Sequence, residues 1–128
     1  MRLLLDTHIW LWLISDPAKI GKHALAELTA PQNEIWISPI STWEAWMLHA
    51  KGRIHLSGDP DAWLARATQS TRMAPLTHEI AMTATQLPMH ADPADRFLAA
   101  TAKVLDLTLV TADQKLLGLG SIQSLANR

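Results

Sequence analysis

The sequence predicts an α/β fold, a three-layer α/β/α sandwich around a parallel sheet of four or five strands, in a single domain covering residues 1–128. Two observations predict it. Short apolar strand segments alternate with longer helical segments along the whole chain, which is the pattern of a parallel sheet with helices on both faces. The strongest strand segments are apolar at nearly every position, as expected of strands buried on both sides.

Composition narrows the class of protein. Apolar residues make up 48% of the chain, and the net charge of -1 argues against a strongly basic nucleic-acid clamp, though not against an enzyme that meets nucleic acid briefly. There is no cysteine, hence no disulfide or thiolate metal site. Asp6 interrupts the apolar start, so we expect no signal peptide. No apolar run reaches the roughly 18 residues that span a bilayer. We therefore expect a cytoplasmic protein without a membrane partner.

The first segments are an apolar strand and two helices. "RLLL" (2–5) is the strand, and "THIWLWLI" (7–14) is a helix because of its length and because Asp6 stands before it as a possible N-cap. "KHALAELTA" (22–30) has a helical pattern and is ended by Pro31.

A second strand and a long helix follow. "EIWIS" (34–38) is rich in β-formers. In "SPISTWEAWMLHAKG" (38–52) we expect Ser41 as the N-cap, with Glu44 three residues later in a capping box and Gly52 as the stop signal.

The middle of the chain is less regular. "DPDAWLARATQS" (59–70) predicts a helix capped by Asp59. "MAPLT" (73–77) predicts a weak third strand, and "HEIAMTATQL" (78–87) a helix closed by Pro88.

The last segments restore the alternation. "DPADRFLAATAKVLD" (92–106) predicts a helix and "LTLVT" (107–111) a strong strand. A short helix in "DQKLLGLG" (113–120) and an edge strand in "SIQSL" (121–125) complete the predicted fold.

Acidic residues follow the strands. Asp6 comes directly after the first strand, and Asp113 lies two residues past the fourth. Glu44 and Asp95 are predicted in the first turns of helices that begin at the same edge, and Asp92 lies one turn before Asp95. Ligand sites in such folds form beyond the carboxyl ends of the strands. We therefore expect Asp6, Glu44, Asp95 and Asp113 to converge there.

Each acid alone has a simpler explanation as a helix cap. Together they are harder to explain in this way. If four carboxylates lie about 5 Å apart, each pair repels by on the order of 3 kcal/mol at an effective dielectric of about 20. The six pairs together then repel by at most roughly 20 kcal/mol. A typical domain is stable by only about 5–15 kcal/mol. Oxygen ligands without cysteine or clustered histidine suit a hard cation, Mg²⁺ or Mn²⁺.

Other polar residues accompany the acids. Thr7, Ser41 and Thr111 could be caps or could orient a carboxylate or a water molecule. Arg96 could balance the acids or touch a phosphate, or could equally be solvated or bridge helices. The six histidines show no ligand spacing, so we expect structural roles for them. Most of the six tryptophans should be core residues. For those near Glu44 an interface is a second interpretation, and base stacking is a third and weaker one.

Four motifs resemble one family. "LLLDTHIWLW", "SPISTWEAWMLHAKGRI", "LPMHADPADRFLAATA" and "LTLVTAD" resemble the successive motifs of the PIN-domain ribonucleases, and within them the VapC-type toxins of bacterial toxin–antitoxin pairs. The resemblance covers nearly all of the chain in the right order. It implies a Mg²⁺- or Mn²⁺-dependent endoribonuclease that cuts RNA by metal-activated water, usually a homodimer, inhibited by a cognate antitoxin protein.

The resemblance also implies roles for single residues. The family's first aspartate matches Asp6, and its helix glutamate matches Glu44. The aspartate before arginine in the family's "DPxDR" motif matches Asp95, and the aspartate of its "TxD" motif matches Asp113. The leading aspartate of "DPxDR" matches Asp92, which we interpret as a structural or supporting acid. Ala94 stands where family members often carry a bulkier residue. The RNA target, the number of metal ions and the antitoxin's identity stay open.

Two other classes compete with the nuclease. A phosphorylated signalling domain needs an acceptor aspartate after a central strand and a lysine at a strand end. Asp6 comes early in the chain for that acceptor, and Lys115 is predicted on a helix. A non-catalytic binding module, whose acids only cap helices, would bind no Mn²⁺ and would gain no thermal stability from metal.

Overall fold

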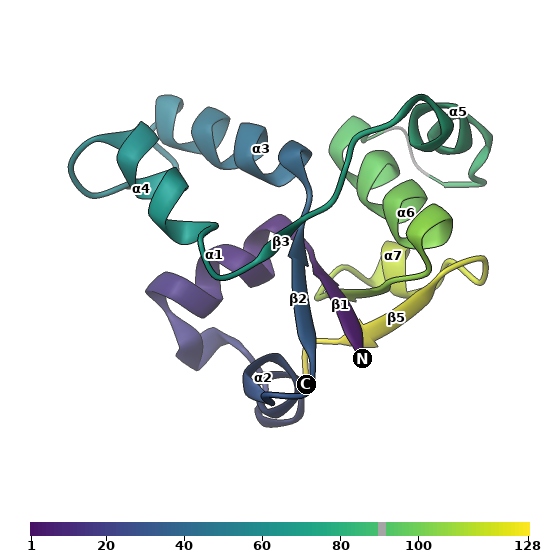
Figure 1. Ribbon diagram of the computed structural model, residues 1–128, viewed down its shortest axis with the longest axis horizontal. Coiled ribbons are helices and arrows are strands. Elements are labelled where there is room, and N and C mark those ends of the chain that lie inside the picture. Colours follow the sequence, from purple (N-terminus) through teal and green to yellow (C-terminus); the bar gives the residue numbers. More distant parts are fainter. Residues whose placement is uncertain (90–91) are drawn as a thin grey trace.

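The computed structural model describes residues 1–89 and 92–128 and confirms the predicted α/β class (Figure 1). All strand pairs are parallel, and the five strands lie in the order β3-β2-β1-β4-β5. The strands are β1 (Arg2–Leu5), β2 (Glu34–Ile37), β3 (Arg72–Met73), β4 (Thr108–Thr111) and β5 (Gln123–Ala126). The helices are α1 (Thr7–Ser15), α2 (Lys22–Thr29), α3 (Pro39–Ala50), α4 (Pro60–Ala67), α5 (His78–Gln86), α6 (Pro93–Leu105) and α7 (Gln114–Leu117), with a 3₁₀ turn at Pro17–Lys19.

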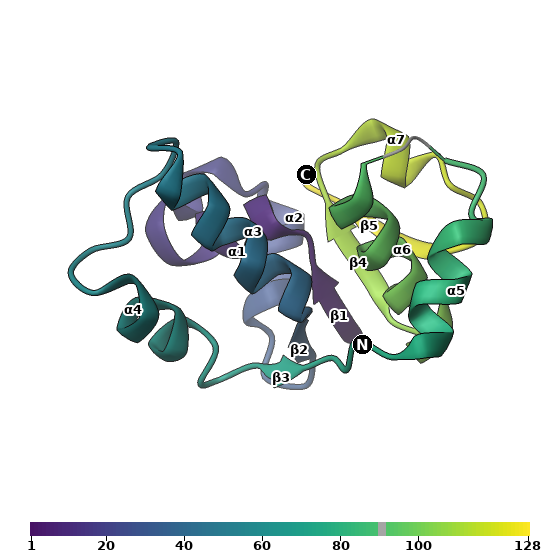
Figure 2. The same ribbon diagram turned by 90° about the horizontal axis from the view of Figure 1, so that it is seen from above.

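Alternation along the buried strands separates two cores. In β1, Leu3 and Leu5 pack among α1, α2, α3 and α4, whereas Leu4 packs on the other face with α5, α6 and α7. All three leucines are fully buried. Figures 1 and 2 show the same division, with α1–α4 on one side of β1 and β2 and α5–α7 on the other. The chain therefore has the three layers that the sequence predicts.

The start of α3 differs from the prediction. The N-cap is Ser38, whose side chain accepts a hydrogen bond from the Ile40 amide at 3.1 Å, and Pro39 is the first helical residue. Proline favours this position because its missing N–H is not needed there. The prediction that Ser41 caps the helix is wrong, and Glu44 consequently lies in the second turn rather than the first.

Strand β3 is shorter and earlier than predicted, covering only Arg72–Met73. Ala74 still donates its amide to the carbonyl of Ile37 at 2.8 Å, but Pro75 has no amide hydrogen with which to continue the ladder. The other predicted elements are confirmed within a few residues. Gly52 has a φ of 72°, as expected of a glycine just after a helix.

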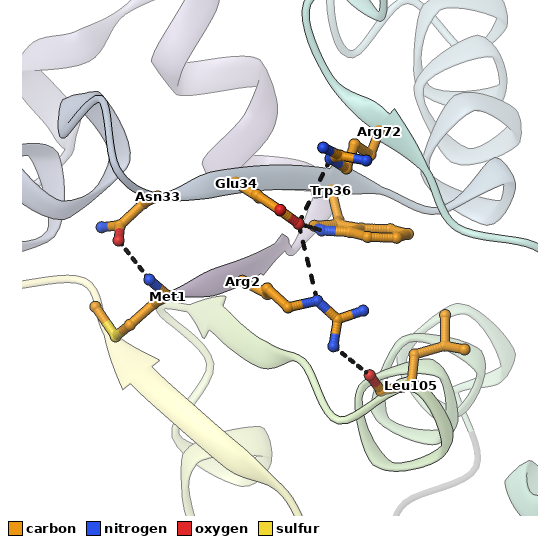
Figure 3. A network of polar contacts seen from close by, with 7 residues as sticks. All are labelled: Met1, Arg2, Asn33, Glu34, Trp36, Arg72 and Leu105. Carbon is orange, nitrogen blue, oxygen red and sulfur yellow. Dashed lines mark hydrogen bonds and ion pairs between the residues drawn. The ribbon is translucent and has the colours of Figure 1, made fainter.

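A polar network ties the first three strands together at their amino ends (Figure 3). The Oε1 atom of Glu34 lies 3.8 Å from Arg2 Nε and 3.5 Å from Arg72 Nε, and accepts a hydrogen bond from Trp36 Nε1 at 3.1 Å. Both guanidinium groups lie over the Trp36 ring, at 5.1 and 5.9 Å from its centroid. Arg2 also donates to the carbonyl of Leu105 at the end of α6, so the network joins the sheet to a helix.

The carboxyl edge of the sheet is fixed by the central pair of strands. Asp6, the residue after β1, donates its backbone amide to the carbonyl of Val110 in β4 at 3.0 Å. The loops that leave β1 and β4 therefore start side by side, which brings Asp6 and Asp113 to the same edge. Separately, none of the helices in the described residues is long and apolar enough to cross a membrane.

Candidate active site

All four predicted acids line one cavity, which we call the acidic cavity. It has a volume of about 410 Å³ and is lined by Asp6, His8, Trp12, Glu44, Asp92, Asp95, Ala112 and Asp113. Its residues come from the ends of β1 and β4 and from α1, α3 and α6, segments that are far apart in the sequence. The expected convergence at the carboxyl edge of the sheet is therefore present.

Asp6 is the most buried of these acids and is held at both carboxylate oxygens. Its side chain is 9% exposed. The Oδ1 atom accepts a hydrogen bond from the Thr7 amide at 2.7 Å and caps α1, and Oδ2 accepts one from Thr111 Oγ1 at 2.7 Å. Because one partner lies at the end of β4, the carboxylate is fixed between the two central strands.

Burial raises the pKa of Asp6 above its ordinary value, because a charge loses hydration in the protein interior. The hydrogen bonds from Thr111 and from the Thr7 amide lower this pKa, as does the nearby charge of His8, whereas the negative charge of Asp113 raises it. Burial outweighs the lowering effects. Asp6 is thus an electrostatically unfavourable carboxylate as long as no cation lies near it.

The other acids combine capping with a place on the cavity. Asp113 caps α7 by accepting a hydrogen bond from the Lys115 amide at 2.8 Å, and Asp92 caps α6 by accepting one from the Asp95 amide at 3.2 Å. Asp95 is half-buried in the first turn of α6. Glu44, half-buried in the second turn of α3, has no part in the N-cap of that helix.

The three predicted hydroxyls are buried beside the acids. Thr111 Oγ1, besides donating to Asp6, accepts a hydrogen bond from the Asp113 amide at 3.0 Å, so one hydroxyl connects two acids. Thr7 Oγ1 donates to Ser41 Oγ at 2.9 Å, joining α1 to α3 one turn before Glu44. Both Thr7 and Ser41 are fully buried, which makes them positioning residues rather than lining residues.

Arg96 does not line the acidic cavity. Its Nη1 donates to the carbonyls of Ala84 and Leu87 at 2.8 and 3.2 Å, and its Nη2 donates to the carbonyl of Met89 at 2.7 Å. Of the roles open to it from the sequence, the structure shows the helix-bridging one: Arg96 anchors α6 to the end of α5. It thereby supports the first turn of α6, which carries Asp95.

Besides Ala112, two aromatic lining residues were not expected from the sequence. His8, for which we expected a structural role, is exposed on the acidic cavity, and its ring lies 5.9 Å from that of Trp12, one helical turn later. The i, i+4 spacing directly after the capping Asp6 was the available signal. His49 does have a structural role, since its Nδ1 accepts from the Leu56 amide at 3.2 Å. His90 lies outside the described residues.

The chemistry of the donors fits a hard divalent cation, since the cavity offers five carboxylates and no thiolate. Within residues 1–89 and 92–128, no three or more Asp, Glu, His or Cys side chains are arranged so that together they could hold one ion. Mg²⁺ does not need such a cage, because it commonly binds through one or two carboxylates and takes its other ligands from water and phosphate. The residues present therefore fit Mg²⁺ or Mn²⁺ in that open mode.

Comparison with known proteins identifies the family of this chain. The family model for the PIN domain matches residues 3–120. The chain belongs to the PIN domain family. This PIN domain is 32% identical over 116 residues to Ribonuclease VapC22 of Mycobacterium tuberculosis (strain ATCC 25618 / H37Rv). The aligned region covers 89% of the chain and 88% of the relative.

Solved structures show the same fold at lower identity. VapBC2 from Rickettsia felis, bound to a DNA fragment from its promoter, matches with a TM-score of 0.73 and 19% identity over 98% of each chain. A toxin–antitoxin complex from Klebsiella pneumoniae matches with a TM-score of 0.70 and 22% identity, also over 98% of each chain. At these identities the likeness concerns the arrangement of helices and strands.

Proposed function

We propose that this PIN domain is a Mg²⁺- or Mn²⁺-dependent endoribonuclease that acts in the cytoplasm as the toxin of a toxin–antitoxin pair. We take residues 1–128 as one functional unit. The observation that carries the proposal is the convergence of Asp6, Glu44, Asp95 and Asp113 on one cavity at the carboxyl edge of the sheet. The relationship to Ribonuclease VapC22 supports RNA as the substrate.

In this proposal the four acids are the catalytic residues and the metal ligands. A divalent cation bound by one or two of them, with water and phosphate as its other ligands, would activate a water molecule and offset the charge of the phosphodiester. Asp6 is held firmly in place, since Thr7 and Thr111 fix both of its oxygens.

The remaining predicted residues position these acids. Thr111 connects Asp6 to Asp113, and Ser41 connects α1 to the helix that carries Glu44. Asp92 supports the first turn of α6 beside Asp95, and Arg96 anchors the same helix.

We also propose an antitoxin protein and a second copy of the chain as partners. The structural relatives include toxin–antitoxin complexes, which supports the first. An apolar hollow between α3, α4 and β3, which includes Trp46 and Met73, supports a protein contact. Trp46 is 43% exposed and Met73 46%, and contiguous exposed apolar residues of this kind are typical of a protein contact.

Cleavage of single-stranded RNA by the purified chain tests the activity. We expect cutting with Mg²⁺ or Mn²⁺ and none with a chelator. Asp95→Asn should reduce the rate by more than about 100-fold, because loss of groups outside a ligand set already costs 10–100-fold. Asp106→Asn is the matched control: it is the same substitution at the other end of α6, at a left-handed residue (φ 55°) that asparagine tolerates.

Calorimetry with Mn²⁺ separates the nuclease from a binding module. We expect the wild type to bind Mn²⁺ and Asp95→Asn to bind it more weakly. If the wild type binds no Mn²⁺ and melts at the same temperature with and without it, the acids serve only as caps and the proposal is wrong. Wild-type cleavage by Asp95→Asn would refute the assignment of the site.

A further inference from the structure

Two more cavities adjoin the acidic cavity and share lining residues with it. The first, which we call the Trp12 cavity, has a volume of about 230 Å³ and shares His8 and Trp12 with the acidic cavity. The second, the Trp43 cavity, has a volume of about 330 Å³ and shares Glu44 and Asp92 with it. The three cavities therefore form one connected surface, in which Arg53 lines the Trp43 cavity and the next residues, Ile54 to Leu56, line the Trp12 cavity.

The Trp12 cavity combines aromatic rings with a cation. Its lining includes Trp12, Trp63 and His55, and Lys19 Nζ lies 5.7 Å from the centroid of the Trp12 ring. Lys19 also lies 3.9 Å from an oxygen of Asp16, in a pair whose side chains are 59% and 50% exposed. An ion pair this exposed contributes little, so Lys19 can exchange Asp16 for a phosphate at small cost.

The Trp43 cavity has the same combination. Trp43 is 53% exposed on α3, and Lys51 and Arg53, both exposed, line the cavity with it. Met47 contributes a polarisable apolar wall. Each side of the acidic cavity thus offers an indole and at least one flexible cation.

We propose that the three cavities form a track for single-stranded RNA, with one base stacked at Trp12, another at Trp43, and the scissile phosphate between them over the acids. Lys19 on one side and Lys51 with Arg53 on the other would neutralise the flanking phosphates. This inference rests on the proposed ribonuclease function and adds to it where the strand runs.

The arrangement of charge favours a nucleic-acid strand over a peptide. Cationic side chains line both adjoining cavities, beside the half-buried Trp12 ring in one and the exposed Trp43 ring in the other, whereas the acidic cavity holds acids that only a cation-bridged phosphate would approach. Aromatic stacking with flanking cations is the way in which proteins hold unpaired bases. A duplex does not fit this track because its bases are already stacked on one another.

Binding of a labelled single-stranded RNA of about ten nucleotides tests the track. Measurements use the Asp6→Asn background with Mg²⁺, so that the RNA stays intact, over a series of salt concentrations. The test variants are Trp43→Ala and the double variant Lys51→Gln/Arg53→Gln. Their matched controls are Met82→Ala, an exposed apolar residue on α5 outside the track, and Lys22→Gln/Lys103→Gln, exposed cations on α2 and α6.

We expect Trp43→Ala to weaken binding about tenfold, within the range for loss of one stacked base. The double variant should reduce the slope of log K against log salt by about 1.4, since each phosphate contact on a single strand contributes about 0.7. When Asp6 is left intact so that RNA is cut, each test variant should lower kcat/KM by about the same factor by which it weakens binding. The controls should bind as the parent protein does.

Each other outcome overturns the track. If the wild type cuts RNA but the test variants bind it like their controls, the inference fails and the proposed function stands. If the test variants bind RNA normally and lose only a protein partner, the surface serves that partner instead. Equal affinity for duplex RNA also contradicts the track. If the wild type neither binds nor cuts single-stranded RNA, the inference and the proposed function fail together.

Discussion

Replacing Asp6 by asparagine should stabilise the metal-free protein and remove much of its stabilisation by metal. Asparagine has nearly the same shape, so its Oδ1 can still accept from the Thr7 amide while its Nδ2 donates to Thr111 Oγ1. The substitution removes a charge that burial makes unfavourable, as the raised pKa of Asp6 indicates. A gain of about 0.5–2 kcal/mol is usual for a stabilising substitution.

The sign of the pH dependence follows from the same shift. Because the pKa of Asp6 is raised in the folded protein, folding favours its protonated form, and stability falls as pH rises through the folded-state pKa. Below the pKa of the unfolded chain the charge is absent from both states and costs nothing. The melting temperature of Asp6→Asn, relative to the wild type, should therefore be higher near pH 7 than near pH 4.

Metal should reverse the order. An ion present at 100 times its dissociation constant stabilises the wild type by about 2.7 kcal/mol. In a domain of 128 residues this corresponds to a rise in melting temperature of roughly 8–13 °C. Thermal melts with chelator and with Mn²⁺, at both pH values, measure all of these differences. An Asp6→Asn protein that is less stable than the wild type in chelator at pH 7, and gains as much from Mn²⁺, would refute the reasoning.

Three further substitutions test how the site is held. Thr111→Val should cost about 1–3 kcal/mol in thermal melts, because it leaves a buried oxygen of Asp6 and the Asp113 amide without their partner, whereas Thr111→Ser should cost less. Ser38→Ala should lower the free energy of unfolding by about 1 kcal/mol, because the N-cap of α3 is lost. Replacing an N-cap serine by glycine usually costs only a few tenths of a kcal/mol, so an equal effect of Ser38→Gly would contradict the capping role. Arg96→Met should lower stability by on the order of 3 kcal/mol through the carbonyls that lose their donor, with a smaller loss of kcat per folded molecule because the helix that carries Asp95 is held less firmly; a loss of kcat without a loss of stability would show a direct role.

The fold was predictable because its signals are local. "RLLL" and "LTLVT" are apolar throughout, and strands of this kind are found between two layers of helices. The errors arose where local rules compete. The pattern from Ser41 to Glu44 fits a capping box, but Pro39 can only be a first helical residue, and this places the cap at Ser38. The order of strands in the sheet is a property of long-range packing, which periodicity does not contain.

The convergence of the acids was predictable for a different reason. Parallel strands end at one edge, so an acid after β1 and another after β4 must be neighbours if those strands pair, as they do. His8 and Trp12 were missed because their side chains reach the acidic cavity from a helix that also fills the core, and an apolar helix shows no obvious solvent face in its sequence. Their exposure depends on how α1 lies against α3 and α4.

Capping and cation binding are not alternatives for these acids, and magnitudes show why. The N-terminus of a helix stabilises a nearby carboxylate by about 0.3–1 kcal/mol. Asp6, Asp113 and the Asp92–Asp95 pair lie at the N-termini of α1, α7 and α6, so three helix dipoles together contribute about 1–3 kcal/mol. Even at a spacing of about 10 Å, six like-charge pairs repel by roughly 10 kcal/mol at an effective dielectric of about 20, before screening by salt. The dipoles therefore offset only a minor part of the repulsion. The caps fix where the oxygens lie, and the charge that they leave uncompensated is what we propose a divalent cation balances.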